Sequence, residues 1–177
     1  MKLLLHICCA PCMIYPLECL REKGFEVTGF FYNPNIHPSA EHDNRKQAVE
    51  DFSKAVDLEV IYPEYNPEEF FRLVSSNNAG PGRCSICWEL RMAKTVLEAK
   101  EKDFDYFSTT LLVSPYQDQG LLRGIGEHFE EEENVNFYYE DFRPGFKKAH
   151  YEAKEKGIYR QKYCGCVYSI KPAQPLR

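Results

Sequence analysis

The chain has 177 residues and a net charge of −5, and 44% of its residues are hydrophobic while 28% are charged. A chain of this size can bury its own core without disulfides, so we expect a single domain that spans residues 1–177. The acidic balance argues against wrapping of nucleic acid by the whole surface. No apolar stretch is long enough to span a bilayer, and His6 and two cysteines interrupt the N-terminal apolar run. We therefore expect a cytoplasmic protein with no signal peptide and no membrane partner.

Apolar runs typical of strands alternate with longer helical patterns along the chain. The strand patterns cover residues 2–7, 25–32, 58–62, 104–109 and 136–140. The helical patterns cover residues 13–24, 39–56, 67–76, 84–102, about 120–133 and 146–156. Such alternation predicts an α/β fold, with a parallel sheet of about five strands and helices on both faces.

Local signals predict where several helices begin and end. Gly24 suits the position just after the first helix, where a left-handed backbone is common. Ser39 is expected to cap the N-terminus of the second long helix. A loop at residues 77–82, rich in Asn, Gly and Pro, is expected to deliver Cys84 to the start of a helix.

Thiols and polar side chains follow the predicted strands. The first strand is followed by Cys8, Cys9 and Cys12, the second by Asn33 and Asn35, and the fourth by Thr109, Thr110, Ser114 and Asp118. In an open parallel sheet, ligands bind outside the carboxyl ends of the strands, at the point where the strand order reverses. The sequence therefore predicts one site at this edge of the sheet.

Seven of the eight cysteines form three clusters. The clusters are Cys8-Cys9-Ala10-Pro11-Cys12, Cys84-Ser85-Ile86-Cys87 and Cys164-Gly165-Cys166, and Cys19 is expected in the core. Because cytoplasmic thiols stay reduced, clustered cysteines there more often bind metal or do redox chemistry than form structural disulfides. The spacing of Cys84 and Cys87 lets both sulfurs reach one metal or cluster, and Arg83 and the helix N-terminus are expected to lower their pKa values.

The adjacent pair Cys8 and Cys9 favours an iron–sulfur centre, since neighbouring side chains diverge and can reach different irons or a second metal. A closed zinc site with four thiolates is an alternative. Cys9 and Cys12 also match the C-x-x-C pattern of a thioredoxin-like thiol–disulfide oxidoreductase, although that interpretation leaves the other clusters unexplained. Cys164 and Cys166 can form a small, easily reduced disulfide or supply further ligands.

Three other side chains near the predicted site have candidate roles. Asp118 can ligate an iron, donate a proton or cap a helix, and Tyr116 can also donate a proton. His6 lies within a buried strand and is expected to be a packed histidine rather than a ligand.

Positive charge is concentrated at the C-terminal end of the chain. Residues 143–177 hold nine Lys/Arg and two Asp/Glu, a net of +7, whereas the 142 residues before them have a net of −12. Aromatic residues lie among these bases, so the segment suits single-stranded or loop RNA, and an ordinary solvated basic helix is the alternative. The RNA-binding candidates are Arg143, Lys147, Lys148, Arg160 and Lys162.

Six segments together resemble the QueH family of cobalamin-independent epoxyqueuosine reductases. They are HICCAPC (6–12), FYNPNIHPSAEHDNR (31–45), GRCSICWELR (82–91), STTLLVSPYQD (108–118), EDFRPGF (140–146) and YRQKYCGCVYS (159–169). The resemblance covers the whole chain in order and follows the cysteine pattern of the family.

The resemblance implies reduction of epoxyqueuosine to queuosine at the wobble position of tRNA, with the anticodon loop as the bound partner and an electron donor that the sequence does not identify. It implies a [4Fe–4S] cluster, a second mononuclear iron nearby, no cobalamin, and a Rossmann-like fold of the adenine-nucleotide α-hydrolase type. By motif match, the expected cluster ligands are Cys8, Cys9, Cys84 and Cys87. Asp118 is a candidate ligand that binds through a carboxylate rather than a thiolate. Cys164 and Cys166 match the C-x-C motif of the family.

Overall fold

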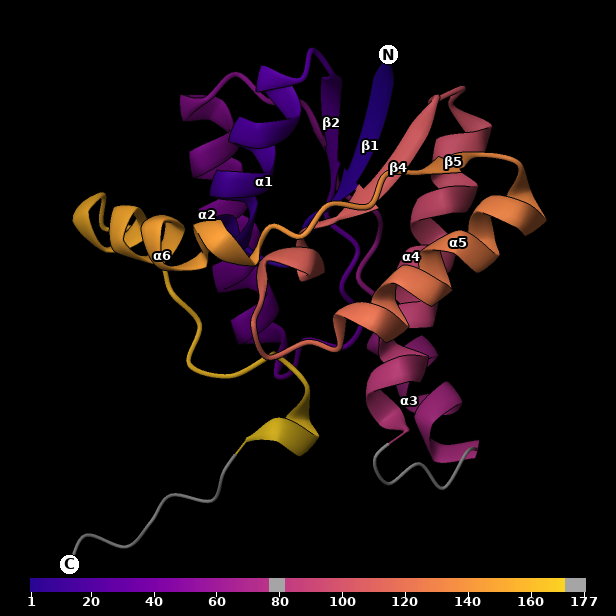
Figure 1. Cartoon of the computed structure of the whole chain (residues 1–177). Helices are drawn as coiled ribbons and strands as arrows, with labels where there is room; N and C mark the ends of the chain where they lie inside the picture. The colour runs from indigo at the N-terminus through magenta and orange to yellow at the C-terminus, as the bar shows by residue number, and fades with distance from the viewer. Residues whose placement is uncertain (77–81, 171–177) are drawn as a thin grey trace, which may run out of the picture.

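A computed structural model of the chain describes residues 1–76 and 82–170 (Figure 1). Most of the loop expected at residues 77–82, and the last seven residues of the basic segment, lie outside the described residues. Among the described helices, none combines the length and the apolar character needed to cross a membrane.

Five parallel strands form one sheet in the order β3-β2-β1-β4-β5. The strands are β1 (Lys2–His6), β2 (Glu26–Phe30), β3 (Val60–Ile61), β4 (Tyr106–Thr109) and β5 (Asn136–Phe137). The central strand β1 is apolar on both faces, and Leu3, Leu4 and Leu5 have no exposed surface, as expected when helices cover both sides of a sheet. The predicted parallel sheet of five strands is confirmed, with two-residue strands at both edges.

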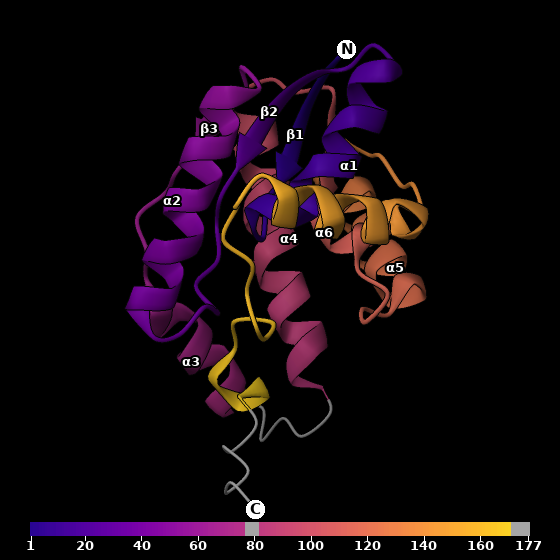
Figure 2. The ribbon, with the colours of Figure 1, turned by 90° about the vertical axis from the view of Figure 1, so that its left-hand side faces the viewer.

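Helices cover both faces of the sheet (Figures 1 and 2). The helices are α1 (Ala10–Glu22), α2 (Ser39–Ala55), α3 (Pro67–Ser76), α4 (Arg83–Glu101), α5 (Gln119–Glu133) and α6 (Phe146–Glu155), and the short 3₁₀ turns are η1 (Thr110–Val113), η2 (Arg143–Gly145) and η3 (Val167–Ser169). On one face α1 packs against α2 and α6, and on the other α4 packs against α3 and α5. The predicted helices are therefore confirmed, and they form the two outer layers of a doubly wound fold.

Two predicted helix boundaries have different outcomes. Gly24 follows α1 with φ +82°, and its amide and that of Phe25 donate to carbonyls in the last turn, which confirms the predicted glycine stop. The prediction that Ser39 caps α2 was wrong, because Ser39 is the first helical residue and Pro38 occupies the cap position. The Glu41 and His42 amides bond to the Pro38 carbonyl, and α2 has no side-chain cap.

The first helix also begins earlier than expected. It starts at Ala10, because Cys9 has an extended backbone (φ −171°, ψ 162°) and Pro11 fits the first turn, where no amide donor is required. As a result, the helix begins within the first cysteine cluster, and its N-terminus lies next to the end of β4 at the point where the strand order reverses.

Candidate metal centre

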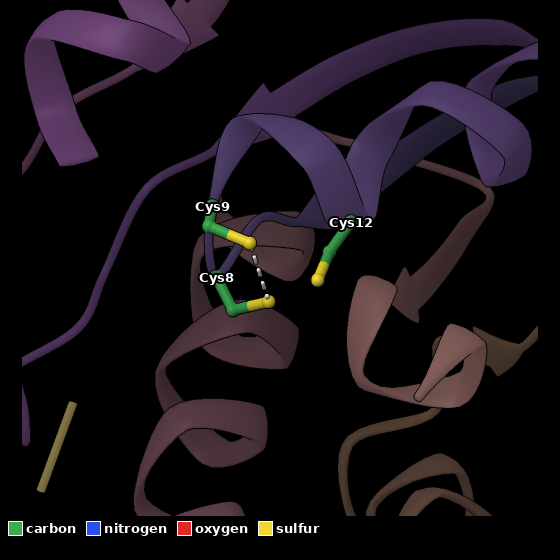
Figure 3. Close-up of side chains that lie close together, drawn as sticks. All are labelled: Cys8, Cys9 and Cys12. Carbon is green, nitrogen blue, oxygen red and sulfur yellow. Dashed lines mark hydrogen bonds between the residues drawn. The ribbon is translucent and has the colours of Figure 1, made fainter. Parts of the chain in front are cut away.

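Three cysteine sulfurs meet at the carboxyl end of β1. The Sγ atoms of Cys8, Cys9 and Cys12 all lie within 4.8 Å of one another, and those of Cys8 and Cys9 are 3.8 Å apart. Figure 3 shows the three side chains directed toward one another at the start of α1. Cys9 and Cys12 are buried and Cys8 is partly exposed, so the group is reachable from one side. The expectation that the neighbouring Cys8 and Cys9 side chains diverge was wrong, because their sulfurs converge where the chain passes from β1 into α1. Cys12, which the sequence places at the same edge of the sheet, joins them from the first turn of the helix.

The end of β4 supplies hydrogen bonds to this group. The Cys8 amide donates to Thr110 Oγ1 over 3.1 Å, and the Thr110 hydroxyl lies 3.3 Å from Cys8 Sγ, to which it donates. His6 is fully buried, and its ring nitrogens lie 2.9 Å from Thr109 Oγ1 and 3.2 Å from the Tyr32 carbonyl. His6 is therefore a packed histidine, as predicted, and Thr110 fixes the position of the Cys8 sulfur.

The three thiols have different proton affinities. Hydrogen bonds from the Cys12 and Cys9 thiols, and from the Thr110 hydroxyl, hold the pKa of Cys8 well below its usual range. Burial raises the pKa of Cys9. The hydrogen bonds that Cys12 makes to Cys8 and Cys9 raise its own pKa, and burial adds to the increase. Cys8 is thus the most easily deprotonated thiol of the group, and a metal that binds all three sulfurs must displace protons from Cys9 and Cys12.

The second cysteine pair lies in the first two turns of α4. Cys84 is exposed, whereas Cys87 is buried. Burial raises the pKa of Cys87 to about 11, in spite of the opposing effect of the Arg91 guanidinium. The prediction of a lowered pKa was therefore wrong for Cys87, because desolvation outweighs the nearby positive charge. Neither Cys84 nor Cys87 belongs to the close group of three sulfurs.

A segment at the C-terminal end of the chain, residues 159–166, reaches back to the thiol group, and we call it the thiol segment. The Gln161 amide nitrogen donates to Cys9 Sγ over 2.9 Å and lies 3.8 Å from Cys12 Sγ. The Arg83 guanidinium at the start of α4 lies 4.6 Å from the centroid of the Tyr168 ring, which places the chain next to the C-x-C pair near α4. All eight cysteines are described, and all are free thiols in this structure, so the disulfide between Cys164 and Cys166 stays a prediction.

The two candidate proton donors lie at the N-terminus of α5. Asp118 is the helix cap, and its Oδ1 accepts from the Leu121 amide over 3.0 Å. Tyr116 is 84% exposed, and its ring lies edge-on to Phe146 with centroids 5.9 Å apart. The close group of metal-binding atoms in the described residues includes no carboxylate. The capping role of Asp118 is thus established, while its catalytic role and that of Tyr116 stay predictions.

The candidate RNA-binding residues are surface side chains, and two of them form ion pairs. Arg143 Nε lies 2.7 Å from Asp141 Oδ1, and Lys148 Nζ lies 2.7 Å from Glu18 Oε2. Lys147, Arg160 and Lys162 are exposed. Contact of these side chains with phosphates stays a prediction.

Sequence reasoning missed two residues of the site. The sequence places Cys12 at this edge of the sheet but gives it a role only in the thioredoxin-like interpretation, although its spacing from Cys9 brings the two together once α1 begins at Ala10. Gln161 gave no signal at all, because an amide side chain in a basic segment has no pattern that points to a sulfur 152 residues away.

Fold and site together define a doubly wound, Rossmann-like α/β protein with a candidate metal centre of thiols at its switch point. The family model described as "Epoxyqueuosine reductase QueH" matches residues 3–172. The chain therefore belongs to the QueH family, which confirms the resemblance found in the sequence.

Relatives named epoxyqueuosine reductase QueH match over nearly the whole chain. The protein of Dehalococcoides mccartyi is 40% identical, with 95% of this chain and 92% of the relative covered. That of Thermotoga maritima is 37% identical, with 94% and 89% covered, and that of Streptococcus pyogenes is 33% identical, with 96% and 71% covered.

One solved structure supports the fold assignment independently of sequence. It is a predicted subunit of a tRNA methyltransferase from Methanocaldococcus jannaschii, with a TM-score of 0.56 and 10% identity, and the match covers 86% of this chain and 76% of that one. At this identity the likeness concerns the fold alone. It agrees with the Rossmann-like α/β architecture of this chain.

Proposed function

We propose that this chain is an oxidoreductase that reduces epoxyqueuosine to queuosine at the wobble position of tRNA, the last step of that modification. The observation that carries the proposal is the group of three cysteine sulfurs at the switch point of the sheet, in a chain of the QueH family. We propose further that residues 1–177 form a single reductase domain that acts in the cytoplasm.

The donor set fits a soft metal centre. Three sulfurs lie within 4.8 Å of one another, and side-chain donors from Thr110 and Gln161 are directed at them. Thiolates with hydrogen-bonded sulfurs are typical of iron–sulfur, zinc and copper(I) sites.

We propose that Cys8 and Cys9 of this group, together with Cys84 and Cys87 of α4, hold a [4Fe–4S] cluster. Cys12 is then the sulfur left beside the cluster for a second, mononuclear iron, and no cobalamin takes part. For α4 to supply its two ligands, Cys87 must lose the proton that burial favours.

Reduction of an epoxide to an alkene breaks both carbon–oxygen bonds and releases the oxygen as water, which requires two electrons and two protons. When bound, an iron–sulfur cluster supplies electrons one at a time. The protein must therefore provide proton donors and orient the substrate. Asp118 and Tyr116, at the start of α5, are the side chains that we propose for proton delivery, and an electron donor that remains to be identified reduces the centre.

Binding of tRNA is assigned to the basic C-terminal segment. Arg143, Lys147, Lys148, Arg160 and Lys162 would contact phosphates of the anticodon loop, and exposed aromatic rings such as Tyr151 and Tyr168 would stack on unpaired bases. The modified base must leave the loop to reach the sulfurs, which costs less from a loop than from a duplex.

Anaerobic purification with iron, sulfide and zinc quantified tests the proposal. We expect a brown protein that contains iron and sulfide and converts epoxyqueuosine in tRNA, and we expect Cys87→Ser to lose the colour while Cys19→Ala, at a buried cysteine outside the site, keeps it. Absence of iron and sulfide after reconstitution would exclude the mechanism.

The closeness of Cys9 and Cys12 supports one rival function, a thioredoxin-like oxidoreductase. That activity predicts a colourless protein that reduces insulin and loses this activity in Cys9→Ser. A zinc-stabilised RNA-binding module predicts zinc and no turnover.

A further inference from the structure

The thiol segment contains no helix or strand between α6 and η3, so its place on the protein depends on individual contacts. Figure 2 shows the chain after α6 running down between α2 and α4. On one side Gln161 reaches Cys9, and on the other side the segment lies against the N-terminal half of α2. The contacts with α2 are the ones that hold the segment in place.

Arg45 on α2 makes the central contact. Its side chain is only 2% exposed, which is rare for an arginine. The guanidinium donates from Nη2 to the Tyr163 carbonyl over 2.9 Å and from Nη1 to the Cys164 carbonyl over 3.1 Å. It also lies 5.5 Å from the centroid of the Tyr163 ring. One side chain thus bonds two consecutive carbonyls, a task that matches the planar fork of arginine and that lysine cannot perform.

Glu41 completes this contact from one helical turn earlier. Arg45 Nε donates to Glu41 Oε1 over 2.7 Å, and the Tyr159 hydroxyl donates to the second oxygen of Glu41. Because both charges are buried and paired, the loss of either would leave the other as an unpaired charge in the protein interior. The pair therefore bonds both ends of the thiol segment, at Tyr159 and at Tyr163–Cys164.

Gly165 allows the backbone to approach Arg45 so closely. It has φ +113°, and a Cβ placed on it would lie 2.9 Å from Ile36 Cγ1 and 3.1 Å from Arg45 Nη1. The His37 amide donates to the Gly165 carbonyl over 2.8 Å, and the Tyr163 hydroxyl donates to the His37 carbonyl. Any side chain at position 165 would push the segment away from α2.

We propose that Arg45 is a positioning residue that fixes the thiol segment against the metal centre, so that the Gln161 amide reaches the Cys9 sulfur and the C-x-C pair stays near α4. The meaning of this contact for catalysis rests on the proposed function, but the contact itself does not. The hydrogen bonds of Arg45 in the described residues go to Glu41 and to the carbonyls of residues 163–164, and it is through this backbone that it positions the segment.

The test combines limited trypsin digestion with a redox titration of the reconstituted protein. In Arg45→Lys, which keeps the charge beside Glu41, we expect cleavage after Arg160 and Lys162 at least tenfold faster than in the wild type, equivalent to about 1.4 kcal/mol. The midpoint potential, followed by electron paramagnetic resonance, should fall, because a weaker bond from Gln161 to Cys9 stabilises the reduced state less. Arg21→Lys is the matched control: Arg21 also donates to two consecutive carbonyls, those of Val56 and Asp57, far from the sulfurs.

Gly165→Ala should reproduce both effects without removing a charge. Its control is Gly157→Ala, at a glycine with φ +65° and open space around its Cα. Wild-type cleavage rates in Arg45→Lys would overturn the proposal, and so would faster cleavage with an unchanged potential. If Arg45→Lys is digested throughout the chain, Gly165→Ala decides alone: local cleavage supports the proposal, and a wild-type rate overturns it. If no cluster assembles in the wild type, the proposed function fails, while the digestion still tests the contact.

Discussion

Gly124 and Gly126 lie on the same helix, α5, but have different surroundings, and substitution of each by alanine tests how α5 packs on the sheet. A Cβ on Gly126 would lie 2.2, 2.3 and 2.4 Å from three ring carbons of Phe137, whereas a Cβ on Gly124 would have nothing within 4 Å. The Phe137 ring on β5 cannot easily yield, because it packs against the fully buried Phe107 with centroids 5.1 Å apart.

Both substitutions gain stability from the higher helix propensity of alanine, but only Gly126→Ala also loses stability from overpacking. Alanine is preferred over glycine in a helix interior by about 1 kcal/mol, so Gly124→Ala should raise the free energy of unfolding by about 0.5–1 kcal/mol. Gly126→Ala gains the same term but overpacks the core, at a cost of about 1–3 kcal/mol. Because the overlap involves three ring atoms, we take the upper part of this range and expect a net loss of about 2 kcal/mol.

Urea unfolding followed by circular dichroism, with reduced protein at fixed pH, measures both changes. The midpoints should move in opposite directions with an unchanged slope, which would show that the stability of the native state has changed. If both variants were stabilised to the same extent, the close packing of α5 on Phe137 would be refuted.

Three further predictions concern the site and its surroundings. Gln161→Leu should lower the midpoint potential of the reconstituted centre, since it removes an N–H donor 2.9 Å from Cys9 Sγ; an unchanged potential would mean that this bond is absent from the loaded protein. Asp118→Ala should cost about 1 kcal/mol of stability because it removes the helix cap, whereas Asp118→Asn should keep the cap. Loss of turnover in the stable Asn variant would support proton delivery by Asp118, and full turnover would exclude it. Burial lowers the pKa of His37 in the folded protein, so the unfolded chain takes up a proton at a higher pH than the folded protein does. The stability that neutral His37 provides is therefore complete above about pH 6.5, and it is lost as the pH falls toward the lowered pKa. Between pH 7.5 and 5.5, the urea midpoint should therefore decrease less in His37→Phe than in the wild type. His128→Gln, at an exposed histidine, is the control. Equal decreases in His37→Phe and the wild type would contradict the reasoning.

The layered fold was predictable because its signals are local. Strand runs such as residues 2–7 and the helical patterns between them fix the alternation, and alternation leaves few topologies other than a parallel sheet. The position of Cys8 and Cys9 at the carboxyl edge follows from that topology. Ser39 shows the limit of local signals, since α2 begins at Ser39 itself and Pro38, without a side-chain cap, occupies the cap position.

Features of the site that depend on burial or on distant contacts were not predictable. The sequence showed Arg83 and a helix N-terminus beside the second cysteine pair, but not that desolvation would outweigh nearby positive charge at Cys87. Contacts from Arg45 and Gln161 join residues more than 100 positions apart, and no period or spacing in the sequence encodes them. Cys12 lies between these cases, because it joins Cys9 at the start of the helix only when α1 begins at Ala10 and not at the predicted residue 13.

The two halves of the thiol site are held by different kinds of interaction, and this difference bears on how a tRNA base can reach it. Cys8, Cys9 and Cys12 lie between the central strand and the first turn of α1, in the most buried part of the fold. The thiol segment is held mainly by side-chain bonds to α2, and its neighbour η3 is exposed. Segments with few buried apolar contacts open at lower free energy than core strands. We therefore expect amides of residues 159–166 to exchange with solvent by local opening while those of β1 exchange only on global unfolding. Such opening would uncover the sulfurs of Cys9 and Cys12 without disturbing their positions, which is what entry of a bulky nucleotide requires.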